Sequence, residues 1–297
     1  HGLEDLKIKT LRHVSKAFSD DPVRLLRAAR FAAKFASMGF TIADETNALM
    51  YDMVKKGEVD ALVSERVWKE TEKALQTTAP EVYFECLRRC GALEIIFPEL
   101  HALYGVPATK HFHGEIDTGI HVMMVLAKAA ELSDSPLVRF GALMHDLGKG
   151  LTTFENLPSH PEHAQKGVDL VIALCDRLNV PNEYKALGVM AAKYHTRAHK
   201  SLNAPAEALL TLLYEMNAFR FEQRFQHFLL VCEADAFGRI AKANATYPQA
   251  VYLWDIYCAA KQVDVQQIIK KGAKGAEIKL KLKAAQVMAI DAFIKGQ

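Results

Sequence analysis

Apolar residues recur at three- and four-residue spacing along nearly the whole chain, and no segment alternates strictly between polar and apolar residues. The first pattern is typical of amphipathic helices and the second of half-buried strands. The chain is therefore predicted to be all-α. Helices are expected at 42–56, 64–77, 80–91, 118–132, 162–178, 182–195, 204–216, 220–237, 247–262 and 276–294.

Proline at the start and glycine at the end mark two further helices, over 22–39 and 136–148. Proline loses no hydrogen bond in the first turn of a helix, where the backbone N–H has no partner in any case. The longest breaks in the helical pattern lie at 97–117 and 148–161. The first of these breaks is expected to separate two modules.

The composition indicates a globular protein. Of the 297 residues 50% are apolar and 24% are charged, with 16 Gly and 10 Pro, which excludes a disordered or collagen-like chain. No apolar run reaches the roughly 18–20 residues of a membrane span, and no signal-peptide core follows the first residue, so a cytoplasmic location is expected. The five cysteines lack C-x-x-C spacing and suit reduced core thiols.

Basic residues are unevenly distributed, although the net charge is only +2. Positions 7 to 34 contain eight Lys or Arg and two acidic residues, and positions 261 to 295 contain eight Lys and three acidic residues. Either segment could contact phosphate groups. For the second segment, a solvated helix face is the preferred interpretation.

Four cations share one face of the helix expected after Pro22: Arg24, Arg27, Arg30 and Lys34. The opposite face carries only Leu and Ala and can pack against a core. Guanidinium groups are planar donors that suit phosphates and base edges. The alternative is that acidic residues elsewhere simply pair with these arginines.

Residues 20–31 resemble the E/D-D-P-x-R-x-x-R-x-x-R-F signature of class II tRNA nucleotidyltransferases, the CCA-adding enzymes, and of bacterial poly(A) polymerases. Residues 2–14 resemble the stretch that precedes this signature in the family. The resemblance implies that Asp21, Arg24, Arg27 and Arg30 contact the incoming CTP or ATP. It also implies that 42–100 form the neck and body that hold the tRNA acceptor end, although a plain helical core would show the same pattern.

The family's catalytic head lies upstream of this signature, with a Gly-rich turn and a D-x-D pair that binds Mg²⁺ with CTP or ATP. No D-x-D triplet occurs in this chain. The resemblance therefore implies that the chain begins after the head, as part of a longer protein, and does not add nucleotides by itself.

Histidine and aspartate occur in an order that indicates a metal site: His121, then His145-Asp146, then Asp235. Imidazole and carboxylate suit a divalent ion, and an unpaired carboxylate in an apolar helix is costly to bury. The pattern H…HD…D resembles the HD-domain phosphohydrolases. It implies that these four residues are metal ligands, with His145 and Asp146 central to catalysis.

Further side chains are candidates within the same resemblance. His163 and His195 match positions used for a second metal or for the substrate phosphate. His160 and His199 are weaker candidates, as are the paired His111 and His113, and Lys149 could help to hold a phosphate.

The metal implied by the resemblance is Ni²⁺, Co²⁺, Mn²⁺ or Mg²⁺. A bound ion would lower the pKa of a coordinated water and offset charge on a phosphoryl oxygen. The expected reaction is hydrolysis of phosphorylated nucleotide ends, as a 2′-nucleotidase, 2′,3′-cyclic phosphodiesterase and phosphatase.

Together, in this order, the two signatures resemble the bacterial CCA-adding enzymes that carry a C-terminal HD domain. The resemblance implies the end of the head and the nucleotide-reading helix at 1–40, a tRNA-binding body at 41–110, the HD domain at 111–240 and a helical tail at 241–297. An elongated helical array followed by a helical bundle is expected. Two alternatives stay open: a free-standing HD hydrolase of nucleotides, and a non-catalytic RNA-binding module. The oligomeric state is not predicted.

Overall fold

The computed structural model describes residues 2–107, 117–238 and 246–296, and these residues are almost entirely helical, as predicted. The first part contains α1 (Gly2–Lys7), β1 (Thr10–Leu11), η1 (Lys16–Asp20), α2 (Val23–Phe35), η2 (Ala36–Met38), β2 (Thr41–Ile42), α3 (Asp44–Lys55), η3 (Glu58–Ala61), α4 (Ser64–Leu75), α5 (Pro80–Arg89), α6 (Ala92–Ile96) and α7 (Pro98–His101). The second contains α8 (Thr118–Leu132), α9 (Pro136–Met144), η4 (Leu147–Leu151), η5 (Phe154–Asn156), α10 (His163–Arg177), α11 (Asn182–His199), η6 (Ser201–Asn203), α12 (Ala206–Glu215) and α13 (Glu222–Phe237). The third contains α14 (Pro248–Lys261), α15 (Val265–Lys270) and α16 (Ala276–Lys295).

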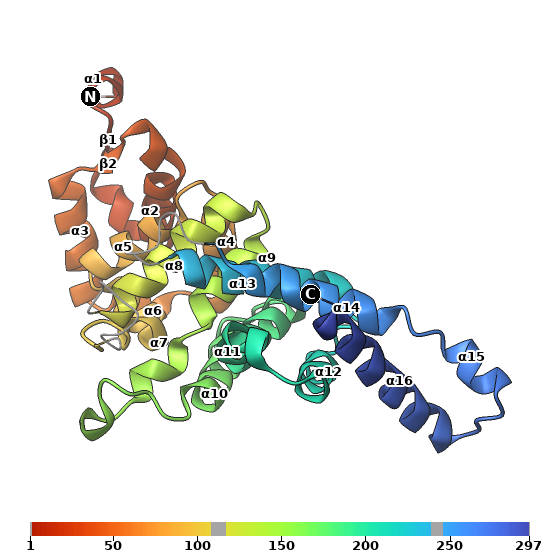
Figure 1. The fold of residues 1–297 in the computed structure, drawn as a ribbon. Helices are drawn as coiled ribbons and strands as arrows, with labels where there is room; N and C mark the ends of the chain where they lie inside the picture. The colour runs from red at the N-terminus through yellow and green to blue at the C-terminus, as the bar shows by residue number, and fades with distance from the viewer. Residues whose placement is uncertain (1, 108–116, 239–245, 297) are drawn as a thin grey trace.

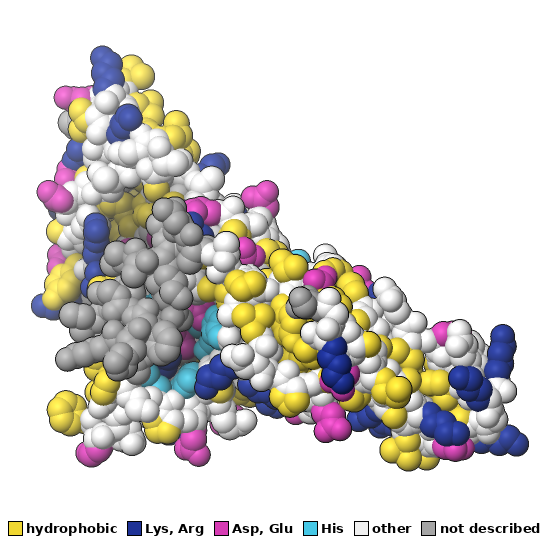
Figure 2. All heavy atoms as spheres, in the orientation of Figure 1, with side chains coloured by type: hydrophobic (Ala, Val, Ile, Leu, Met, Phe, Trp, Pro, Cys, Tyr) yellow, Lys and Arg dark blue, Asp and Glu magenta, His cyan; other side chains and the backbone are white. Residues whose placement is uncertain are grey.

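The helices form an elongated array (Figure 1). Helices α1 to α7 lie at the N-terminal end, α8 to α13 occupy the centre, and α14 to α16 extend to the far end. Lys and Arg side chains gather at that far end (Figure 2). Within the described ranges, none of the helices combines the length and the apolar composition needed to cross a bilayer.

Two short strands were not expected. Strands β1 and β2 pair in parallel, with Thr10 opposite Thr41 and Leu11 opposite Ile42. Each strand has only two residues, too few to show an alternation of polar and apolar positions. The pair ties the segment before α2 to the segment after it.

The apolar face predicted for the arginine helix is buried. In α2, Leu25, Leu26, Ala29, Ala32 and Ala33 are all at most 2% exposed. They belong to a core that continues from the N-terminal helices into α8 to α11.

Aromatic rings join the N-terminal helices to the central helices. The ring of Trp68 on α4 packs edge to face against the rings of Phe140 on α9 and Tyr184 on α11. The distances between ring centroids are 5.7 Å and 4.9 Å. Because the two predicted modules share this core, the division near residue 110 stays a prediction. A second core joins α12 and α13 to α14 and α16 of the predicted tail.

The helix expected to end at Gly148 ends earlier. Helix α9 stops at Met144, His145 is its C-cap, and Asp146 has a φ of −113° and a ψ of 10°, outside the helical region. A 3-10 turn, η4, then covers Leu147–Leu151. The prediction of a helix over 136–148 was therefore wrong for Asp146, which projects from the turn that follows α9.

Candidate functional site

Five helices bring the predicted metal ligands together. His121 lies on α8, His145 and Asp146 lie at the end of α9, His163 begins α10, His195 lies on α11 and Asp235 lies on α13. Apart from His163, which is partly buried, these side chains are between 1% and 4% exposed. Part of a histidine cluster is visible in cyan on the face shown in Figure 2.

The side chains form two adjoining groups of three. In each group, one nitrogen or oxygen atom per residue lies within 4.8 Å of the others: His121, His145 and Asp235 in the first, and Asp146, His163 and His195 in the second. Such spacing allows each group to surround one ion.

Asp146 lies between the two groups. Its Oδ2 is 3.2 Å from His145 Nε2, and its Oδ1 is 3.4 Å from His195 Nε2. Asp235 Oδ1 is 3.2 Å from His121 Nε2 and 3.8 Å from His145 Nε2, and Asp146 Oδ2 is 3.9 Å from His121 Nε2. Both carboxylates thus lie close to the same two imidazoles.

Backbone carbonyls orient three of the imidazoles. In His145, His163 and His195, the ring Nδ1 lies 2.7, 2.7 and 2.9 Å from the carbonyl oxygen of the residue three or four positions earlier. A carbonyl oxygen only accepts, so in the neutral rings Nδ1 carries the proton and Nε2 keeps a lone pair. The Nε2 atoms of these three histidines are the ones that face the carboxylates or lie close to them.

Unsatisfied polar atoms in the cluster fit a cation. Among the described residues, neither His145 Nε2 nor Asp146 Oδ1 has a hydrogen-bond partner, although both are buried. Buried polar atoms are normally satisfied, and an exception points to a missing ion or water. The residues present therefore fit a divalent metal.

The electrostatics of the cluster agree with this fit. Burial alone would raise the pKa of Asp146, but the charges of Lys149 and His145 outweigh it and the pKa lies well below its usual range. Burial likewise opposes ionisation of Asp235, whose pKa is nevertheless held well below its usual range by His145 and His199. Burial lowers the pKa of His195, whereas the charges of Asp146 and Asp235 raise the pKa of His145 in spite of its burial. Anionic carboxylates beside a neutral imidazole are the states that bind a metal.

The weaker candidates have different surroundings. His199 Nε2 lies 2.6 Å from Asp235 Oδ2, and its Nδ1 lies 2.8 Å from the hydroxyl of Tyr247. Lys149 Nζ lies 2.6 Å from Asp146 Oδ2. His160 uses its two nitrogens on the Thr152 hydroxyl and the Pro107 carbonyl instead. His111 and His113 lie outside the described residues.

A close approach of two backbones holds the His145-Asp146 turn in place. A Cβ added to Gly148 in η4 would lie 1.9 Å from the carbonyl oxygen of His163 and 2.6 Å from the backbone nitrogen of Gly167 in α10. Only glycine leaves room for this contact. The turn that carries Asp146 is thereby pressed against the helix that begins with His163.

The residues of the arginine signature lie on and just before α2. Asp21 Oδ1 accepts from the backbone N–H of Val23, and its Oδ2 lies 2.7 Å from Arg66 Nη2, a hydrogen bond that lowers the pKa of Asp21. Arg24 donates to the carbonyl of Ala17. The alternative, in which acidic residues pair with the arginines of α2, does not describe Asp21, because its partner Arg66 lies on α4. It does describe Arg30, which pairs with Glu70.

Arg30 is the most enclosed member of the set. Its Nε lies 2.6 Å from Oε2 of Glu70 on α4, and both side chains are at most 14% exposed. Arg27 lies between two cavities, one on each side of it. A direct contact of Arg24, Arg27 or Arg30 with a nucleotide stays a prediction.

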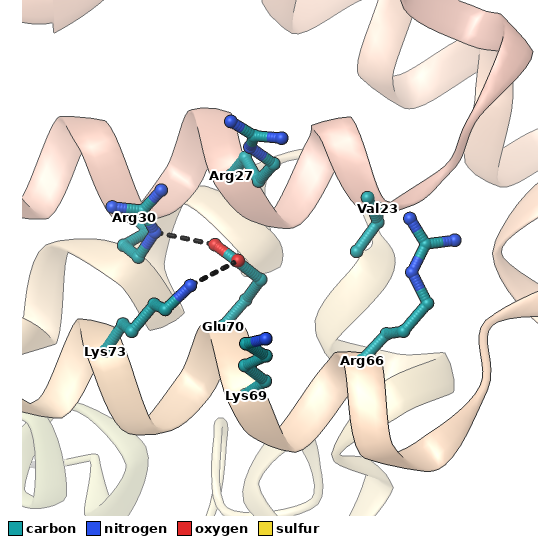
Figure 3. A pocket seen from close by; sticks show the side chains of 7 residues that line it. All are labelled: Val23, Arg27, Arg30, Arg66, Lys69, Glu70 and Lys73. Atoms are coloured by element: carbon teal, nitrogen blue, oxygen red, sulfur yellow. Dashed lines mark hydrogen bonds and ion pairs between the residues drawn. The ribbon is translucent and has the colours of Figure 1, made fainter.

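The two cavities beside α2 differ in their walls. One of about 270 Å³ has His13, Phe18 and Phe31 beside Arg24 and Arg27. The other, of about 340 Å³, lies between α2 and α4 and has a wall of cations (Figure 3). The α4 residues of this wall were not singled out from the sequence. Their spacing at 66, 69 and 73, one helical face, was the signal that could have found them.

Two families match parts of the chain. Residues 39–104 match the family described as the probable RNA and SrmB-binding site of polymerase A. Residues 118–240 match the HD domain. The second range contains all six predicted ligands of the two groups.

Solved structures share the fold. A CCA-adding enzyme in complex with CTP superposes with a TM-score of 0.59 at 18% identity, over 98% of this chain and 61% of that one. The Thermotoga maritima CCA-adding enzyme in complex with tRNA gives a TM-score of 0.59 at 17% identity, over 98% of this chain and 62% of that one. The chain thus spans less than two thirds of these structures.

Relatives of higher identity extend over the whole chain. The Multifunctional CCA protein of Psychromonas ingrahamii is 49% identical over 99% of this chain, which covers 72% of that protein. The protein of the same name from Thioalkalivibrio sulfidiphilus is 50% identical over 98% of this chain and 71% of its own length. With both its N-terminal signature and its HD cluster inside these matches, the chain belongs to the family of multifunctional CCA proteins.

Proposed function

We propose that the HD cluster is the active site of a metal-dependent phosphohydrolase. The observation that carries the proposal is the convergence of six buried or partly buried histidines and aspartates, from five helices, into two adjoining groups with ligand spacing. Imidazole nitrogens and carboxylate oxygens converging in this way are the ligand set of divalent metal sites.

In this proposal, the first group holds one ion through His121, His145 and Asp235. The second group holds another ion, or the substrate phosphate, through His163 and His195, and Asp146 serves both groups because its two oxygens face opposite ways. A bound divalent ion supplies Lewis-acid chemistry, which makes water more acidic and offsets charge on a phosphoryl oxygen. Lys149 is placed to add positive charge beside Asp146.

The proposed substrates are 2′-phosphates and 2′,3′-cyclic phosphates at nucleotide ends. In the reaction, water adds to phosphorus, the bond from phosphorus to the ribose oxygen breaks, and the ribose hydroxyl takes up a proton. The cluster is buried but reaches the surface near the partly buried His163 and His199. Such limited access suits a phosphate at the end of an RNA strand better than one in the middle of a strand.

Removing divalent ions is expected to abolish this hydrolysis, because Lys149, the cation beside Asp146, cannot make a water more acidic as a bound ion does. The chain is treated with a chelator, and hydrolysis of 2′-AMP, 2′,3′-cAMP and an aryl phosphate is measured before and after addition of Ni²⁺, Co²⁺, Mn²⁺ or Mg²⁺. Full activity in the presence of chelator, or none with any of the four ions, would contradict the proposal. If metal analysis finds no bound divalent ion and the chain binds none that is added, the result would favour a non-catalytic RNA-binding module.

The second part of the proposal concerns the nucleotide-reading helix. We infer that Asp21 and Arg24 read the base of CTP or ATP and that Arg27 and Arg30 contact the nucleotide. We also infer that a longer protein containing this chain adds or repairs CCA at tRNA 3′ ends, with Mg²⁺ bound in a preceding head. The family membership supports this inference, as does the cavity with aromatic walls beside Arg24 and Arg27. An aromatic wall next to a guanidinium suits a nucleobase.

Replacing Arg24 by Gln is expected to weaken CTP and ATP binding about tenfold, because a charged hydrogen bond to the base is lost. Nucleotide binding to the full 297-residue chain is measured by equilibrium dialysis, with Arg89→Gln on the exposed side of α5 as a matched control. Equal affinities for the two variants would contradict the base-reading role. Hydrolysis of free nucleotides without any dependence on Arg24 or on tRNA would favour a free-standing HD hydrolase.

A further inference from the structure

The cavity between α2 and α4 carries an excess of positive charge. Figure 3 shows the two helices side by side, with side chains from both entering the space between them. The cavity measures about 340 Å³ and is lined by Val23, Arg27, Arg30, Arg66, Lys69, Glu70 and Lys73. Five of these seven side chains are cations, and one is an anion.

Glu70, the single anionic side chain of the cavity, already pairs with two of its cations. Glu70 Oε2 lies 2.6 Å from Arg30 Nε, and Glu70 Oε1 lies 3.3 Å from Lys73 Nζ (Figure 3). Burial would raise the pKa of Glu70, but Arg30 and Lys73 hold it below its usual range, so the carboxylate is ionised at neutral pH. Arg66 is paired with Asp21 outside the cavity.

Two cations remain without an acidic partner. Within the ranges that the structure describes, neither Arg27 on α2 nor Lys69 on α4 makes an ion pair, and both are exposed. They line the same cavity from opposite helices, next to the other three cations. The positive charges that line this cavity repel one another, and an anion bound between them would offset the repulsion.

The residues that line the cavity indicate which kind of anion it could bind. No aromatic side chain lines this cavity, so it offers no stacking surface for a base, in contrast to the neighbouring cavity with Phe18 and Phe31. No carboxylate oxygen is left to bind the Mg²⁺ that accompanies a nucleoside triphosphate. The cavity therefore suits a phosphate that is reached without a metal and without reading a base.

We propose that this cavity binds a backbone phosphodiester of an RNA strand through Lys69 and Arg27. Arg30 and Glu70, which pair with each other, then form the wall of the cavity. Since Arg27 also borders the cavity with aromatic walls, it connects the phosphate site to the site proposed for the base. That the ligand is RNA rests on the proposed function; the preference for a phosphate rests on the cavity itself.

The test is the salt dependence of RNA binding. Each phosphate contact contributes about 0.7–0.9 to the slope of log affinity against log salt concentration. The affinity of the full chain for tRNA is measured between low and physiological KCl for the unchanged chain, for Lys69→Gln and for Lys193→Gln. Lys193 is an exposed lysine on α11 that lies outside the cavity and outside residues 39–104.

Lys69→Gln is expected to reduce the slope by about 0.7–0.9 and to weaken binding by the same factor for tRNA with and without its terminal CCA. Lys193→Gln is expected to leave the slope unchanged, and Lys69→Gln should leave CTP affinity unchanged. Equal slopes for the two variants would overturn the proposal. A loss of CTP affinity in Lys69→Gln with an unchanged slope would also overturn it and assign the cavity to the nucleotide's phosphates.

The outcomes separate this inference from the proposed function. Unchanged RNA binding in Lys69→Gln, together with nucleotide binding that depends on Arg24, would overturn the phosphate site and leave base reading intact. No binding of tRNA by the unchanged chain would overturn both.

Discussion

Replacing Asp146 by Asn is expected to lower the rate of phosphate-ester hydrolysis by about 1,000-fold or more, because a charge contribution of about 4 kcal/mol corresponds to that factor. Asn keeps the size of the side chain but removes its charge. The oxygens of Asp146 lie 3.2 Å from His145 Nε2 and 3.4 Å from His195 Nε2. Its loss should therefore weaken metal binding in both groups at once.

Initial rates with 2′-AMP and 2′,3′-cAMP, at saturating metal, measure this effect. Metal content and the rise in Tm on addition of metal give a second readout, because a ligand that binds only the folded state stabilises it. Asp169→Asn, an exposed position on α10, is the matched control and should retain full activity. An Asp146→Asn variant with the rate and metal content of this control would exclude a role for the HD cluster in catalysis.

Replacing Arg139 by Met is expected to reduce the free energy of unfolding by about 3 kcal/mol, because several backbone carbonyls lose their donor. Arg139 on α9 is 3% exposed. Its Nη1 lies 2.7 Å from the carbonyl of Leu75 and 2.9 Å from that of Thr77, after the end of α4. Its Nε lies 3.0 Å from the carbonyl of Ser133, after α8.

Arg139 thus bonds to backbone carbonyls at the C-terminal ends of α4 and α8, which lie on opposite sides of the predicted division near residue 110. Urea unfolding followed by circular dichroism measures the change, and Arg89→Met, at an exposed position, should stay within about 0.5 kcal/mol of the unchanged chain. A separate unfolding step for the HD domain in Arg139→Met would show that this arginine couples the two parts. Equal stability of both variants would show that water satisfies the carbonyls.

Most helices could be predicted from the sequence because their burial is periodic. The helix at 118–132 was predicted with the bounds that the structure shows for α8. The helix expected to end at 195 continues to His199, which places His199 one turn beyond His195 and beside Asp235. Neither Gly nor Pro marks the C-terminal end of this helix, so the spacing of apolar residues did not define where it stops.

The candidate metal ligands could be listed from the sequence but not located. Residue order and the H…HD…D pattern singled out His121, His145, Asp146 and Asp235, and their roles stay predictions. The contribution of Asp146 to both groups depends on α9 ending at Met144, because a turn rather than a helix then aims its carboxylate. The pattern of apolar residues carries no information on that direction.

What the sequence by itself determined is local: an all-α chain, the apolar face of α2, and the kinds of side chain available for metal and phosphate. These follow from periodicity and from the chemistry of single residues. The tertiary structure alone decided which charges meet, pairing Arg30 with Glu70 and leaving Arg27 and Lys69 to share a cavity. Electrostatic interactions act through space, so their outcome depends on how α2 packs against α4, which no local pattern records.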